Sequence, residues 1–211
     1  MEEEPAALLR ARSLAAIAQN GLAFTRDPYD RERFAQLQAI AADMLADSGA
    51  GDATALRGLL AAEQGYMTPK VDVRAAAFDA QGRILMVREV ADGGRWTLPG
   101  GWADPGQSAS ACAIRELYEE SGYTGRADKL ALVHDRATQG HTPAGLFSIY
   151  KLFFLCTLTG GAPATSLETS EIAFFAEDAI PHDLSRGRVL PHQIARLFAH
   201  RRDPDLPTEF D

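Results

Sequence analysis

The stretch GGWADPGQSASACAIRELYEESGY, which runs from Gly100 to Tyr123, crowds three glutamates into five residues. They are Glu116, Glu119 and Glu120, and a glycine at position 122 follows them. Like charges three and four residues apart on a helix repel one another by roughly 0.2–0.5 kcal/mol per pair. The segment therefore calls for a positive partner, either a bound cation or a basic side chain such as Arg115.

The acidic segment is predicted to be an amphipathic helix that starts at Ser108, a residue type that caps helices well. At about 100° per residue, the three glutamates fall within an arc of about 100°. The apolar residues expected on the opposite, core-facing side are Ala111, Ile114, Leu117 and Tyr118. Clustered carboxylates suit Mg²⁺ or Mn²⁺, although a solvated acidic face paired with neighbouring lysines would show the same pattern.

The segments on either side of this helix have the period of strands. VDVRAAAF alternates apolar and other residues, DAQGR is a turn signal, and ILMVREV follows, so residues 71–90 are predicted to form a hairpin. Further strands are expected at LALVHDRAT, FSIYKLFFLCTL and EIAFFA. The second of these is apolar at nearly every position, which is typical of a central strand buried on both faces. Pro191 opens a last predicted helix.

The first third of the chain is predicted to be helical. An Ala- and Leu-rich segment, residues 5–20, is expected to stop at Gly21. Asp27 and Pro28 then begin a second helix, and residues 53–64 form a third. The order of elements predicts a helical domain over residues 1–66, a domain over 67–205 with a mixed sheet and packed helices, and a tail over 206–211.

Composition narrows the function classes. The chain has 211 residues and a formal net charge of -8, so it has no general attraction for nucleic acid or an anionic membrane. A phosphate-bearing substrate would need a local positive group, such as a metal ion. The acidic start, the lack of an apolar run of about 20 residues and only two cysteines predict a cytoplasmic protein with buried, reduced thiols.

The spaced residues of this stretch resemble the signature of the Nudix hydrolases, G-x5-E-x7-R-E-U-x-E-E-x-G-U, where U is bulky and apolar. The matching residues are Gly101, Arg115, Glu116, Leu117, Glu119, Glu120, Gly122 and Tyr123. One position departs, because Gln107 stands where the family has glutamate. The family glutamate is a partner of the motif arginine, and Gln107 keeps a carbonyl acceptor for Arg115 but loses the charge.

The resemblance implies an α/β fold, the Nudix α/β/α sandwich with a mixed sheet. It also implies Mg²⁺ or Mn²⁺ as cofactor, held by the carboxylates of Glu116, Glu119 and Glu120 and by the carbonyl of Gly100. Arg115 would orient a neighbouring glutamate. The expected reaction is the cleavage of a diphosphate link in a nucleoside diphosphate joined to another group, X.

A general base is expected in a late loop, as in several members of the family. The sequence TSLETSEIAFF offers Glu168 and Glu171, and either of them could simply flank a strand. The likeness extends to a Nudix subgroup with an N-terminal helical domain, whose members act on CDP-choline or ADP-ribose. It covers residues 14–198 and implies a homodimer built by the first helices, although the same apolar stripes would also suit an intramolecular bundle.

Other polar residues are candidates for substrate binding. Arg74 and Arg88 could hold a phosphate or form salt bridges, and Asp135 and Arg136 lie in the polar stretch HDRATQGHTPAG. Trp96 could stack on a base or fill the core. Two other functions stay open: a nucleotide sensor without turnover, suggested by Gln107 alone, and a hydrolase that processes RNA ends. An acidic chain disfavours broad RNA affinity.

Overall fold

The computed structural model describes residues 5–211, and residues 1–4, which supply the acidic start, lie outside them. The chain divides into two compact units. One comprises Met1–Lys70 and Ala137–Ser148, and the other comprises Val71–Arg136 and Ile149–Asp211. The segment 137–148 is tied to the first helix, because the Arg12 Nε–H donates to the Gly145 carbonyl at 2.7 Å.

The first unit contains the three predicted helices, α1 (Ala6–Phe24), α2 (Pro28–Asp47) and α3 (Ala53–Ala62). Helix α1 continues through Gly21, contrary to the expected stop at that residue. The reason is tertiary: a Cβ at Gly21 would lie 2.5 Å from the Phe34 ring, so glycine allows α2 to pack closely. The Asp27 side chain accepts hydrogen bonds from the Tyr29 and Asp30 amides and caps α2 as predicted.

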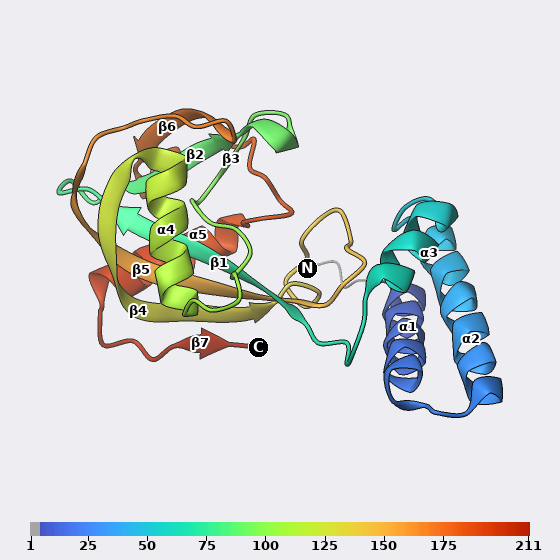
Figure 1. Cartoon of the computed structure of the whole chain (residues 1–211). Helices are drawn as coiled ribbons and strands as arrows, with labels where there is room; N and C mark the ends of the chain where they lie inside the picture. Colours follow the sequence, from blue (N-terminus) through green and yellow to red (C-terminus); the bar gives the residue numbers. More distant parts are fainter. Residues whose placement is uncertain (1–4) are drawn as a thin grey trace. The chain divides into compact units, whose positions relative to one another are not determined.

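The second unit is built around a seven-stranded sheet with the order β3-β2-β1-β5-β4-β7, and β6 pairs with β2 (Figure 1). The strands are β1 (Lys70–Phe78), β2 (Ile84–Glu89), β3 (Arg95–Thr97), β4 (Tyr123–Asp135), β5 (Ile149–Gly161), β6 (Thr169–Phe175) and β7 (Glu209–Phe210). The sheet is mixed, since β4 runs antiparallel to β5 and parallel to β7. Strand β5, predicted to be central, lies between β1 and β4.

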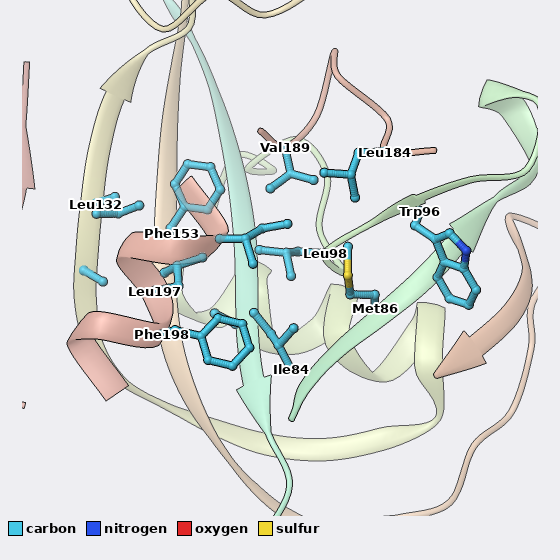
Figure 2. Close-up of a cluster of buried hydrophobic side chains, with 13 residues drawn as sticks. Ile84, Met86, Trp96, Leu98, Leu132, Phe153, Leu184, Val189, Leu197 and Phe198 are labelled. Carbon is cyan, nitrogen blue, oxygen red and sulfur yellow. The ribbon is translucent and has the colours of Figure 1, made fainter. Parts of the chain in front are cut away.

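Alternate residues along the strands point to opposite faces of the sheet, and a hydrophobic core lies on each face. Ala75, Ala77 and Leu85 pack with Cys112 and Leu117 of α4 (Ala109–Ser121). The intervening strand residues, Ile84 and Met86 among them, pack on the other side with α5 (Pro191–Arg202), and Figure 2 shows Ile84 beside Phe198 of this helix. The period-two pattern of the strands therefore produces the predicted layering of helix, sheet and helix.

Two short strands and one aromatic residue add to the predicted layout. Strand β3 pairs with the end of β2, and β7 pairs with β4 where a tail was expected. Both are too short to show a period, and the backbone partner of β7, strand β4, comes from distant sequence. Trp96 is 6% exposed and packs edge-on against Phe175, so it fills the core, the second of its two possible roles. Within residues 5–211, no helix is both long and apolar enough for a membrane span.

Helix α4 ends at Gly122, which adopts a left-handed conformation with φ 74°. Its amide donates to the Tyr118 carbonyl at 2.8 Å, the usual closure of a helix by glycine. A Cβ at this position would lie 2.4 Å from the Ala162 carbonyl oxygen. The end of the acidic helix is therefore fixed both by backbone conformation and by contact with the segment that follows β5.

We expect Gly122→Ala to lower the free energy of unfolding more than Gly106→Ala does. Both glycines have positive φ, 74° and 86°, but nothing lies within 4 Å of a Cβ at Gly106. Gly106→Ala should cost about 1 kcal/mol from conformation alone, and Gly122→Ala should add the clash, for a total above about 2 kcal/mol. Urea unfolding of both variants measures the difference, and equal losses would contradict the close packing at Gly122.

Candidate active site

The loop between β3 and α4 lies along strand β1. The Ala75 amide donates to the Pro99 carbonyl and the Val73 amide donates to the Gly101 carbonyl, each at 2.8 Å. Between these bonds, Gly100 has φ 149°, and a Cβ there would lie 2.0 Å from the Val73 carbonyl oxygen. Only glycine permits this approach, so the loop backbone is held against the strand at the position where the acidic helix arrives.

Glu120 meets this loop from helix α4. Its carboxylate accepts a hydrogen bond of 3.0 Å from the Gly100 amide, and the residue is only 3% exposed. It therefore lies on the buried side of the helix, together with Cys112, Ala113 and Leu117. Tyr118, predicted to be in the core, is 57% exposed instead. The acidic arc is thus turned partly inward, whereas the sequence pattern had separated an acidic face from a core face.

Burial raises the pKa of Glu120 to about 7, from an ordinary value of 4.5. That value is the net result of several effects. The charges of Glu116 and Glu89 also raise the pKa of Glu120, while Arg74 and the Gly100 amide lower it. A carboxylate in this position is destabilised when it ionises in a metal-free protein. A cation placed beside it would reverse that effect.

Glu116 stands one helical turn before Glu120 and beside the second glycine of the loop. A Cβ on Gly101 would lie 3.1 Å from the Glu116 Oε1, so glycine leaves room for the carboxylate. Burial raises the pKa of Glu116, Arg115 lowers it, and the charges of Glu119 and Glu168 raise it again. Its side chain is 12% exposed, which leaves one side of the carboxylate accessible.

Glu119, the third acid, turns away from the other two. Its Oε2 accepts from the Arg115 Nη1 at 2.6 Å, and its side chain is 52% exposed. Among residues 5–211, no three Asp, Glu, His or Cys side chains are grouped so that they could hold a metal ion as they stand. The arrangement brings together Glu116, Glu120 and the Gly100 backbone, and leaves Glu119 paired with Arg115.

The residues that do converge fit a small divalent cation. The two carboxylates supply oxygen donors, the ligand type that Mg²⁺ and Mn²⁺ prefer. Burial raises the pKa of both Glu116 and Glu120, so each charged form would gain from a neighbouring positive ion. The same two carboxylates belong to the metal-ligand set expected from the sequence motif, whereas the Gly100 atom that contacts Glu120 is its amide and not the carbonyl expected as a ligand.

Arg74 lies in a buried ionic cluster. Its Nη2 is 2.6 Å from the Asp72 Oδ2, and its Nη1 donates to the Leu98 carbonyl at 3.2 Å. The Lys151 Nζ donates to the other Asp72 oxygen at 2.7 Å. Burial raises the pKa of Asp72, but Arg74 and Lys151 outweigh it and hold that pKa near 2. Of its two possible roles, Arg74 takes the salt bridge to Asp72, and its charge stabilises ionised Glu120.

The other candidate substrate-binding residues lie in different surroundings. Arg88 donates to Asp183 at 3.0 Å and to Glu171 at 3.4 Å. Asp135 ends strand β4, and its amide donates to the side chain of Asp211. Arg136 is 8% exposed. The Arg136 charge contributes to lowering the pKa of Lys151, which places its guanidinium near the buried Asp72 cluster.

The two candidate bases are in different positions. The charge of Glu168 acts on Glu116, where it raises the pKa of that carboxyl. The neighbouring residue, Thr169, donates its hydroxyl to the Glu120 carbonyl at 2.8 Å, so this segment is anchored to the end of α4. Glu171 pairs instead with Arg88. The structure therefore brings Glu168 toward the acidic cluster and directs Glu171 to an ion pair.

Two acids near the cluster were missed by the sequence analysis. Glu89, 5% exposed at the end of β2, is close enough for its charge to raise the pKa of Glu120. A charged residue at the end of an apolar strand was the available signal. Asp104 contacts Arg115, with 2.8 Å between the Arg115 Nη2 and the Asp104 Oδ2. Nothing in the spacing identified Asp104, because the motif directs attention to position 107.

Comparison with known families gives two matches that follow the division of the chain. A family described as the UDP-X-like, N-terminal oligomerisation domain matches residues 5–60. The NUDIX domain family matches residues 68–193, which include the whole acidic cluster.

Individual relatives agree with these families. The Bacillus subtilis protein YjhB, whose name of ADP-ribose pyrophosphatase is provisional, is 43% identical over 97% of this chain and 96% of its own. The crystal structure of a UDP-X diphosphatase covers both chains in full, with 28% identity and a TM-score of 0.61. An ADP-ribose pyrophosphatase from Streptococcus suis covers 68% of this chain and 100% of its own, with 34% identity and a TM-score of 0.61.

We expect Glu120→Gln to stabilise the metal-free protein at pH 8 and to change it little at pH 5. The folded carboxyl keeps its proton up to a pKa of about 7, whereas the ordinary value is 4.5. Wild-type stability therefore falls as pH rises through this window. The neutral amide avoids the loss, and the melting temperature at pH 8 should rise by about 5 °C.

Thermal unfolding in a chelator at the two pH values measures this effect. Glu177→Gln is the matched control, because Glu177 is an exposed acid paired with Arg202 on the surface of the same unit. A Glu120→Gln melting temperature that follows the wild type at both pH values would contradict the buried, destabilised carboxylate.

Proposed function

Because the chain belongs to the NUDIX domain family, we propose that it is a divalent-cation-dependent hydrolase of nucleoside diphosphates linked to another group, X. The products are a nucleoside monophosphate and phosphorylated X. The observation that carries the proposal is a pair of glutamates, buried Glu120 and half-buried Glu116, facing the Gly100–Gly101 loop. A third acid, Glu168, lies in the segment just before β6, and its charge acts on Glu116.

The residues of the chain divide the work of this reaction. Glu116, Glu120 and the Gly100 carbonyl would hold Mg²⁺ or Mn²⁺, and Glu119 would join them if it left Arg115. A bound divalent cation supplies charge neutralisation of the diphosphate oxygens and a lower pKa for a bound water. Glu120, buried and next to Arg74, is the ligand whose ionisation depends most on that charge.

Glu168 is the proposed general base. It is exposed, and its segment is anchored to the end of α4 through Thr169. In the reaction, a water oxygen attacks one phosphorus, its proton passes to the Glu168 carboxylate, and the bridging oxygen leaves with the other phosphate. Glu171 is less suited to this role, since its carboxylate already pairs with Arg88.

The substrate class is supported by the similar proteins, which differ in the nucleotide that they name. Two are named for ADP-ribose, one provisionally, and one for UDP-X. The family at the N-terminus is described as UDP-X-like. ADP-ribose, UDP-linked sugars and CDP-choline are therefore the three substrate types to compare, with CDP-choline expected from the sequence resemblance.

We expect purified protein with Mg²⁺ or Mn²⁺ to release a nucleoside monophosphate from at least one of these substrates. Chromatography of the products, with hydrolysis in ¹⁸O-labelled water, identifies the phosphorus that is attacked. Glu116→Gln and Glu120→Gln should each lower kcat/KM at least about 100-fold, while the Glu177→Gln control stays near wild type.

The base is tested by a matched pair of variants. Glu168→Gln should lower kcat by about 100-fold or more, and Glu171→Gln should change it only a few-fold. The opposite ranking would assign the base to Glu171. Nucleotide binding without product in the wild type would favour a sensor, and cleavage of a labelled oligonucleotide alone would favour an RNA end-processing hydrolase.

We also propose that the helical unit forms a homodimer. Leu9, Ile17 and Phe24 of α1 are 43%, 56% and 71% exposed, and helical geometry sets them within an arc of about 80°. The buried residues of α1, including Leu8 and Ala15, lie on the other side. An exposed apolar stripe of this kind is a candidate contact surface, and the match to an oligomerisation domain over residues 5–60 supports it.

We expect Ile17→Glu to convert the dimer to monomer, because it would bury a charge in the apolar contact. Light scattering after size-exclusion chromatography measures the mass. Leu167→Glu is the matched control, since Leu167 is 98% exposed in the other unit. A dimer that survives Ile17→Glu would exclude this face of α1 as the interface.

A further inference from the structure

Arg115 lies at the centre of a network of three carboxylates. Its Nη2 is shared between the Asp104 Oδ2, at 2.8 Å, and the Glu116 Oε1, at 3.0 Å. Its Nη1 donates to the Glu119 Oε2 at 2.6 Å. Burial lowers the pKa of Arg115, but the three acids outweigh this effect and raise it. The guanidinium is therefore always charged, and its position decides how much positive charge Glu116 receives.

Gln107, which the sequence analysis assigned to Arg115, contacts other groups. Its side-chain Oε1 accepts from the Cys112 thiol at 3.8 Å, and its backbone amide donates to the Asp104 backbone carbonyl at 3.4 Å. The expected partnership of Gln107 with Arg115 is therefore absent. The acid that reaches the guanidinium is instead Asp104, three residues earlier in the same loop.

We propose that Asp104 is the positioning residue for Arg115 and takes the place of the missing acid at position 107. This inference rests on the proposed function, because Glu116 matters here as a ligand for a divalent cation. Asp104 draws the Nη2 toward the loop. Without Asp104, the Nη2 that it now shares with Glu116 would bind Glu116 alone. The guanidinium, which already contacts Glu116 and Glu119, would then compete more strongly with the cation for their oxygens.

The exposure of the pair separates positioning from stability. The Asp104 side chain is 58% exposed and that of Arg115 is 29% exposed. Exposed ion pairs add little to folding stability, so loss of Asp104 should barely change the melting temperature. Residues that orient a metal ligand have a larger effect on its function, typically about 10–100-fold in metal affinity or activity.

The test uses Asp104→Asn, Asp104→Glu, Gln107→Glu and the double variant Asp104→Asn/Gln107→Glu in the full chain. Mn²⁺ affinity without substrate, read from the electron paramagnetic resonance of free Mn²⁺, is the first measurement. Thermal unfolding and steady-state kcat and KM are the others. Glu177→Gln serves as control, because it removes an exposed acid from another arginine, Arg202, in the same unit.

Asp104→Asn is expected to weaken Mn²⁺ binding by about 10-fold and to lower kcat by a similar factor, with the melting temperature within about 2 °C of wild type. Asp104→Glu should retain most of the affinity. Gln107→Glu alone should change affinity and kcat less than about 3-fold, because Asp104 already supplies the acid, and the double variant should recover most of the loss. Glu177→Gln should match the wild type.

Wild-type Mn²⁺ affinity in Asp104→Asn would overturn the inference, and so would a double variant that recovers nothing. A clear gain from Gln107→Glu alone would also overturn it, since the site would then lack an acid. The two proposals fail separately. If the protein shows no turnover but Asp104→Asn still weakens Mn²⁺ binding, the proposed function is wrong and the inference stands. If the protein is active and Asp104→Asn changes neither Mn²⁺ affinity nor kcat, the inference is wrong and the proposed function stands.

Discussion

The hydrogen bond from the Gly100 amide to the Glu120 carboxylate joins the two halves of the candidate site. It requires the loop backbone to lie on strand β1, which only a glycine at position 100 allows. It also requires a carboxylate on the buried side of α4, where burial raises its pKa to about 7. The site therefore combines a closely packed backbone with an acid whose ionised form is disfavoured by burial, even with Arg74 nearby, and would gain from a further positive charge.

The rest of the second unit positions this contact. Small residues on β1, Ala75 and Ala77, pack with Ala113 of α4 in one core, so the helix approaches the sheet closely. Gly122 ends the helix two residues beyond Glu120 and fixes its length. Thr169 then anchors the start of β6 to the Glu120 carbonyl. The loop, the helix and the late strand thus meet at one point, although they come from distant parts of the sequence.

Charge around the site is layered from the inside outward. A buried cluster of one negative and two positive groups is formed by Asp72, Arg74 and Lys151. The positive charge of Arg74 also lowers the pKa of Glu120. Farther out, Arg115 pairs with Asp104, Glu116 and Glu119. One arginine therefore stabilises the ionised form of buried Glu120, while the other limits the repulsion among the acids at the surface. An acidic chain can in this way present a carboxylate cluster without a lysine-rich face.

Local pattern was sufficient for the longer elements, but not for the short strands β3 and β7. Period-two alternation indicated β1, and the turn signal after it indicated its hairpin with β2. The capping residues Asp27 and Ser108 marked the starts of their helices, and the motif spacing placed Glu116 and Glu120 on one helix. These features depend on residues a few positions apart, so the sequence alone determines them. The tertiary structure decided everything that depends on distant partners. Gly21 is a packing site because the Phe34 ring lies against it, and β7 forms because it pairs with β4. The loop on β1 supplies the amide that contacts buried Glu120, and Arg115 pairs with Asp104 and not with Gln107. Spacing along the chain specifies which side chains share a face, but only the packing of other segments against that face sets the environment of each charge.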